Sequence, residues 1–62
     1  MTPEDYELLT GCERGAMVHE RTPEEAIAAR LYARGWVRRT KIPGKRAHVW
    51  RLTDDGRRAL AA

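Results

Sequence analysis

The fold is decided by residues 36–52, which read WVRRTKI-PG-KRAHVWRL. β-Branched and aromatic residues are frequent on both sides of Pro43 and Gly44, and this pattern predicts two antiparallel strands joined as a β-hairpin. Proline followed by glycine suits the two central positions of a type II turn. That turn type splays the strands, so a longer loop is an alternative to a tight tip. A tight tip would pair Val37 with Trp50, Arg39 with His48, Lys41 with Arg46 and, on the other face, Trp36 with Arg51.

Three helices are expected around this hairpin. Thr2 caps the first helix, which we expect to end between residues 12 and 15 because glycines interrupt it there. The second helix begins after Thr22 and runs to about Arg34, where a glycine follows as a left-handed stop. Thr53 caps a short C-terminal helix whose first turn is acidic and whose later residues are basic, an order that suits the helix dipole. The expected fold class is therefore α+β.

The chain is expected to form one domain over residues 1–62, with a small core. Ile27 and Leu31 lie four residues apart on the second helix and share a face, so both are expected in the core with Ala28 beside them. The tryptophan at the base of the hairpin, Trp50, is expected to be buried rather than stacked on a nucleic-acid base. A dimer partner would add buried surface, so a homodimer is compatible with the sequence.

Charge is divided unevenly along the chain, although the net charge is only +3. Residues 1–31 hold seven acidic and three basic residues, whereas residues 32–62 hold two acidic and nine basic ones. Residues 34–51 contain seven basic residues and no acidic residue. This asymmetry favours a polyanionic partner for one face of the molecule. Two alternatives remain: arginine enrichment in a GC-rich genome, and a solvated hairpin whose charges prevent edge-to-edge aggregation.

Two sequence motifs flank the hairpin. Arg34-Gly35-Trp36-Val37 ends a helix and enters the first strand, and Trp50-Arg51-Leu52-Thr53-Asp54-Asp55-Gly56 leads from the second strand into the last helix. Together with the order of the elements, these motifs resemble the winged-helix family, especially MarR- and PadR-like bacterial regulators, over roughly residues 22–60. The resemblance implies that the helix before the wing, residues 23–34, enters the major groove of DNA and that the wing contacts the DNA backbone or the minor groove.

The resemblance and the basic charge together predict a DNA-binding surface. Phosphates would neutralise the hairpin cations and release counterions, so the affinity is expected to fall steeply as salt rises. Insertion of arginine into a narrow minor groove is an alternative contact. The predicted DNA-contacting residues are Arg30, Arg34, Arg38, Arg39, Lys41, Lys45, Arg46, His48 and Arg51.

The sequence departs from the winged-helix pattern between its first two helices. Only about nine residues separate them, so the supporting helix of a helix-turn-helix is missing or is reduced to a turn or a strand. The second helix also opens with Glu24 and Glu25, whose carboxylates would oppose DNA phosphates. The chain has no Asn, Gln or Ser, so the bidentate amide contact to adenine cannot form, and we expect modest sequence specificity.

An enzyme is not expected, and neither a cofactor nor a metal site is expected. The chain has no serine nucleophile and no glycine-rich phosphate loop. Cys12, His19 and His48 do not have the spacing of metal ligands. Cys12 also falls on a helical face that we expect to be buried, where a thiol is usually inert. Most acidic residues lie at helix starts, where capping explains them.

The functional hypothesis is a DNA-binding winged-helix protein that acts as a small transcriptional regulator or as an accessory factor of a phage or mobile element. The sequence has no apolar run long enough to span a membrane and no hydrophobic N-terminal stretch, so a cytoplasmic location is expected. The alternative is a protein–protein interaction module of the same fold that docks on transcription or phage machinery. The missing supporting helix and the pair Glu24-Glu25 favour this alternative.

Overall fold

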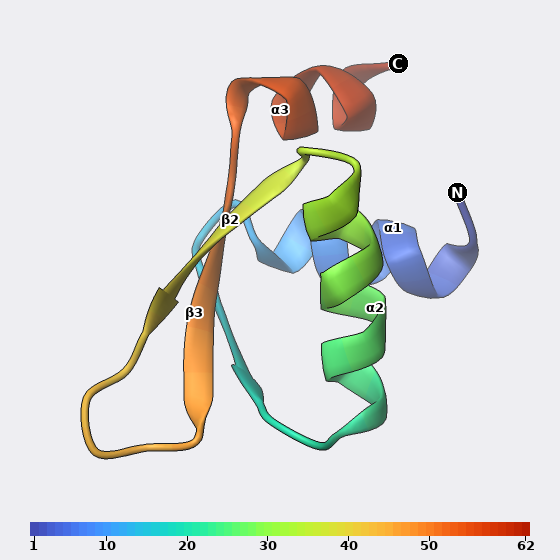
Figure 1. The fold of residues 1–62 in the computed structure, drawn as a ribbon. Coiled ribbons are helices and arrows are strands. Elements are labelled where there is room, and N and C mark those ends of the chain that lie inside the picture. The colour runs from blue at the N-terminus through green and yellow to red at the C-terminus, as the bar shows by residue number, and fades with distance from the viewer.

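The computed structural model describes all residues from 1 to 62, which form three helices and one three-stranded antiparallel sheet (Figure 1). The sheet has the strand order β1-β3-β2, so the last strand in sequence lies in the middle. The fold is therefore α+β, as the sequence predicts. In chain order the elements are α1 (Pro3–Gly11), β1 (Ala16–His19), α2 (Pro23–Ala33), β2 (Val37–Lys41), β3 (Ala47–Leu52) and α3 (Asp54–Ala61).

The first and last helices begin as their capping residues predict. The Thr2 hydroxyl accepts a hydrogen bond from the Asp5 backbone N–H at 3.2 Å. The Thr53 hydroxyl accepts one from the Gly56 N–H at 3.1 Å. Each bond satisfies one of the backbone donors that a helix leaves free in its first turn.

The second helix begins after Thr22 as predicted, but the Thr22 side chain accepts no capping hydrogen bond. The Thr22 hydroxyl instead donates a hydrogen bond to the backbone carbonyl of His19, the last residue of β1, at 2.8 Å. Glu25 Oε1 accepts a hydrogen bond from the backbone N–H of Arg21, the residue before the N-cap, at 3.1 Å. The short connection from strand to helix explains the change, because it keeps the Thr22 hydroxyl within reach of the strand it follows.

The sheet contains a strand beyond the predicted two-stranded hairpin. β1 pairs antiparallel with the free edge of β3, and Met17 lies opposite Val49. Val18, the next residue of β1, is buried in the core. The prediction of a two-stranded sheet was therefore wrong. A central strand with a partner on each side satisfies the backbone groups of both its edges, which a hairpin alone leaves open to water.

The turn at Pro43-Gly44 is confirmed, and the longer loop is found in place of the tight tip, so the register expected for a tight tip is not observed. Gly44 has a positive φ of 75°, and the Lys45 N–H donates to the Ile42 carbonyl at 3.2 Å. The next hydrogen bond across the hairpin joins the Ile42 N–H to the Ala47 carbonyl at 3.1 Å. The loop between the strands is therefore four residues long. The shift of two positions leaves every side chain on its predicted face. The observed pairs are Val37 with Leu52, Arg38 with Arg51, Arg39 with Trp50, Thr40 with Val49 and Lys41 with His48.

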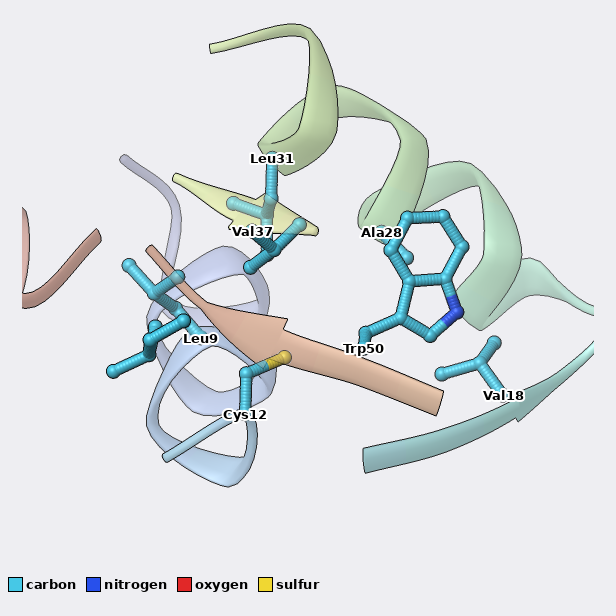
Figure 2. Packing of buried hydrophobic residues seen from close by; sticks show 8 residues of the cluster. Leu9, Cys12, Val18, Ala28, Leu31, Val37 and Trp50 are labelled. Atoms are coloured by element: carbon cyan, nitrogen blue, oxygen red, sulfur yellow. The ribbon is translucent and has the colours of Figure 1, made fainter. Parts of the chain in front are cut away.

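The core lies between the sheet and the helices α1 and α2 (Figure 2). Trp50, only 1% exposed, projects from the central strand and contributes the largest buried side chain. Leu31 and Ala28 of α2 are buried as predicted, whereas Ile27 is only half-buried because it lies toward the surface between α1 and α2. The core cluster consists of Leu9, Cys12, Val18, Ala28, Leu31, Val37, Trp50 and Leu52.

Two hydrogen bonds join the residue that caps α3 to the segment that leads into β2. The Thr53 N–H donates to the Trp36 carbonyl at 3.0 Å, and the Thr53 hydroxyl donates to the Gly35 carbonyl at 2.6 Å. Gly56 packs so close to this segment that a Cβ atom there would lie 2.0 Å from the Trp36 carbonyl oxygen. Glycine is therefore required at position 56 by close packing, which explains its place in the motif that leads into the helix.

Candidate nucleic-acid interface

The basic residues of the hairpin divide between the two faces of the sheet. Successive side chains of a strand point to opposite faces. Arg39 and Lys41 of β2 therefore share the face that α1 and α2 cover, whereas Arg38 projects from the other face. Arg51 of β3 lies directly opposite Arg38. The cations of the strands thus form two separate groups, one on the helix-covered face and one on the outer face.

Arg39 joins the hairpin to α2 through aromatic side chains. Its guanidinium carbon lies 4.8 Å from the ring centroid of Tyr32 and 5.7 Å from that of Trp50. The rings of Tyr32 and Trp50 meet edge to face, with centroids 6.1 Å apart. Tyr32 remains 46% exposed, so Arg39 lies over an aromatic surface at the molecular boundary. These cation–π contacts orient the guanidinium and leave its charge unneutralised.

Lys41 is engaged by other groups of the protein, although its side chain is exposed. Its ammonium group lies 3.1 Å from Glu20 Oε2 and also donates a hydrogen bond to the Lys45 backbone carbonyl. The hydrogen bond from Lys41 lowers the pKa of the Glu20 carboxyl below its usual value. Lys45 and Arg46, by contrast, are exposed at the tip and have no carboxylate within 4.0 Å. The tip therefore retains two positive charges that take part in no ion pair.

Two of the predicted contacts on α2 are engaged within the protein. Arg30 Nη2 lies 2.7 Å from Asp5 Oδ1, and this ion pair joins α2 to α1. The hydrogen bond from Arg30 lowers the pKa of Asp5, whose carboxylate is only 10% exposed. The Arg34 guanidinium lies 5.0 Å from the Trp36 ring centroid. Trp36 therefore has Arg34 as its cationic partner, and the predicted Trp36–Arg51 pair is wrong because Trp36 lies before the start of β2.

His48 is not a freely exposed strand histidine. Its side chain is half-buried on the helix-covered face, and its ring centroid lies 6.0 Å from that of Trp50. The Nδ1 atom of His48 and the indole Nε1 of Trp50 are both buried without a hydrogen-bond partner. Position 48 therefore packs against the core edge, and the free cations of the hairpin lie elsewhere.

The exposed side of α2 carries small side chains. Ala26, Ala29 and Ala33 are all exposed, and their spacing of three and four residues places them along one side of the helix. The signal was present in the sequence as alanines at i, i+3 and i+7. Glu24 is exposed at the start of the helix, whereas Glu25 is engaged with the Arg21 N–H. A partner can therefore approach the middle of α2 closely.

No group of three His, Cys, Asp or Glu side chains comes together in a way that could hold a metal ion. Burial raises the pKa of the Cys12 thiol to about 11, so the thiol stays protonated at neutral pH. None of the three helices has the length and apolar character needed to cross a membrane. Comparisons with protein-family models, curated proteins and solved structures found no match to this chain.

Proposed function

We propose that this protein is a reduced winged helix that binds duplex DNA, with its hairpin as the wing and α2 as the helix placed at the major groove. The proposal is supported by the order of helix, hairpin and helix and by the left-handed Gly35, which ends α2 immediately before the wing. β1 occupies the chain position at which a complete helix-turn-helix would have its supporting helix. As a regulator or accessory factor, such a module would bring the chain to DNA with modest sequence specificity.

The observation that carries the proposal is the set of cations that the protein does not neutralise. Its four ion pairs are Arg30 with Asp5, Lys41 with Glu20, Arg57 with Asp54 and Arg58 with Asp55. Arg39, Lys45 and Arg46 take part in none of them. These three residues lie on the α2 side of the wing and at its tip, so one duplex could reach all three and α2 together. Phosphates would supply the missing negative charge and release condensed counterions.

The aromatic contact of Arg39 gives this surface a fixed geometry. Tyr32 holds the guanidinium between α2 and the wing before any DNA binds, so less side-chain freedom is lost on binding. The exposed methyl groups of Ala26, Ala29 and Ala33 let α2 lie close to the bases in the major groove of DNA. Methyl contacts favour thymine but do not distinguish all four base pairs. Binding would then depend mainly on phosphate charge and DNA shape.

A fluorescence-anisotropy titration with a labelled duplex at low salt tests the proposal. The triple variant Arg39→Ala, Lys45→Ala, Arg46→Ala is expected to bind on the order of tenfold more weakly or worse, because three phosphate contacts are lost. A control variant, Arg14→Ala, Arg57→Ala, Arg58→Ala, removes the same number of charges from elsewhere and should bind nearly as the parent does. Circular dichroism verifies that both variants fold. Equal affinity of the parent and the folded wing variant would show that the wing is not the DNA-binding surface.

A further inference from the structure

The outer face of the sheet is a second exposed surface, distinct from the wing surface proposed to bind DNA. α1 and α2 pack against the face that carries Trp50, and α3 lies beyond the end of the strands (Figure 1). Met17 on the outer face is 51% exposed, and its cross-strand partner Val49 is half-buried. The outer face consists of the exposed or half-buried residues Met17, His19, Arg38, Thr40, Val49 and Arg51, together with the buried Ala47.

The outer face carries positive charge that nothing in the protein balances. Arg38 and Arg51 are directly opposite each other across two strands, and neither has a carboxylate within 4.0 Å. Like charges in such pairs destabilise a sheet. The Arg51 guanidinium lies against Gly15, where a Cβ atom would come within 2.7 Å of Nη1. The absence of a side chain at Gly15 therefore leaves room for Arg51 beside the apolar pair of Met17 and Val49.

A complementary surface lies on the helical side of the molecule. A groove of about 350 Å³ between α1 and α2 is lined by three glutamates around an apolar floor. None of these glutamates takes part in an ion pair. Gly11 leaves one wall of the groove open, because no atom outside its own helix lies within 4 Å of where its Cβ would be. The groove, as defined here, is lined by Glu4, Glu7, Leu8, Gly11, Glu24 and Ile27.

We propose that the outer face of one copy of this protein binds the groove of a second copy. Arg38 and Arg51 would meet the glutamates of the groove, and Met17 and Val49 would cover Leu8 and Ile27. The outer face has no Phe, Tyr or Trp side chain on which a nucleic-acid base could stack, and its apolar centre is better matched by an apolar floor than by phosphates. Two different surfaces meet in this contact, so each added copy exposes a new outer face and the assembly grows head to tail.

The contact is expected to be weak and sensitive to salt, because its ion pairs are solvent-exposed. Sedimentation velocity at low ionic strength and rising protein concentration, without DNA, is the test. The parent is expected to grow beyond a dimer. Two variants are expected to remain monomeric when alone: Arg38→Ala with Arg51→Ala, which lacks the outer-face charges, and Glu7→Gln with Glu24→Gln, which lacks groove charges. The variant Arg57→Ala with Arg58→Ala should assemble as the parent does.

Mixing the two surface variants gives the sharpest result. Each retains the surface that the other lacks, so an equimolar mixture should form a dimer that does not grow further. The proposal is overturned if the parent stays monomeric, if either surface variant assembles as the parent does, or if the mixture assembles no better than its components. It is also overturned if the outer-face variant loses DNA affinity as the wing variant does, because DNA would then be the occupant. The sedimentation results stand apart from the wing titration, so the two proposals can fail separately.

Discussion

The contact between Gly56 and the Trp36 carbonyl predicts that a single added methyl group at position 56 strongly destabilises the protein. In Gly56→Ala, the new Cβ atom would lie 2.0 Å from the Trp36 oxygen and 3.0 Å from Leu52 Cδ2. Carbon–oxygen contacts of this kind are normally about 3.3 Å or longer. The backbone atoms cannot rotate away as a side chain can, so α3 has to withdraw from the hairpin by more than about 1 Å.

The magnitude follows from the contacts that this withdrawal weakens. Thr53 makes two hydrogen bonds to the segment before β2, at 3.0 Å to the Trp36 carbonyl and 2.6 Å to the Gly35 carbonyl. Each such bond contributes about 1 kcal/mol net, and overpacking adds about 1–3 kcal/mol. The higher helix propensity of alanine relative to glycine offsets about 1 kcal/mol of this loss. The net loss is about 2–4 kcal/mol, against a total stability of roughly 3–9 kcal/mol for a chain of this length.

Urea denaturation followed by circular dichroism measures this loss, and Gly11→Ala is its matched control. Gly11 is also helical, but nothing lies within 4 Å of the position of its Cβ atom. Alanine at position 11 should therefore stabilise the protein, by up to about 1 kcal/mol. If Gly56→Ala proves as stable as the parent, the close approach of α3 to the Trp36 carbonyl is not present in solution and the reasoning fails.

Three further predictions concern the core and its ionisable groups. Arg30 lowers the pKa of Asp5 below its usual 3.8. Their ion pair therefore stabilises the fold above that pH, and the stabilisation is lost as pH falls through the folded-state pKa. In urea denaturation at a series of pH values, Asp5→Asn should make the free energy of unfolding depend less on pH below about pH 4. Cys12, buried with a pKa of about 11, should react with iodoacetamide at pH 8 far more slowly in the folded protein than in urea. Leu31→Ala, at a position 1% exposed, should cost about 2–5 kcal/mol in urea denaturation.

Local signals in the sequence predicted most of the elements, but not the size of the sheet. Capping threonines and left-handed glycines act within a few residues, so the three helices and the turn at Pro43-Gly44 could be inferred from neighbouring positions. For the segment of β1 the sequence left a turn and a strand open, because the four residues Ala16–His19 are too few to establish an alternating pattern. The strand exists because β3 offers a free edge, and that edge is a tertiary feature.

The positive charge of the site could be predicted from the sequence, but not which of its cations are engaged within the protein and which stay free. The absence of acidic residues from residues 34–51 identified the hairpin as basic, and the alternation of a strand assigned Arg38 and Arg39 to different faces. The engagement of Arg30 could not be foreseen, because its partner Asp5 is 25 residues away in the chain. Tyr32 likewise gained its role only when the fold brought it beneath Arg39. Contacts between distant segments therefore decide which cations remain free.

The salt dependence of duplex DNA binding tests the central claim most directly. The logarithm of the binding constant should fall linearly with the logarithm of salt concentration, with a slope of about −0.9 for each phosphate contacted. Contacts from Arg39, Lys45 and Arg46 predict a slope of roughly −3 or steeper for the parent, and a slope shallower by roughly that amount once all three residues are alanine. A parent that does not bind duplex DNA even at low salt, or a slope that the three substitutions leave unchanged, would contradict the account.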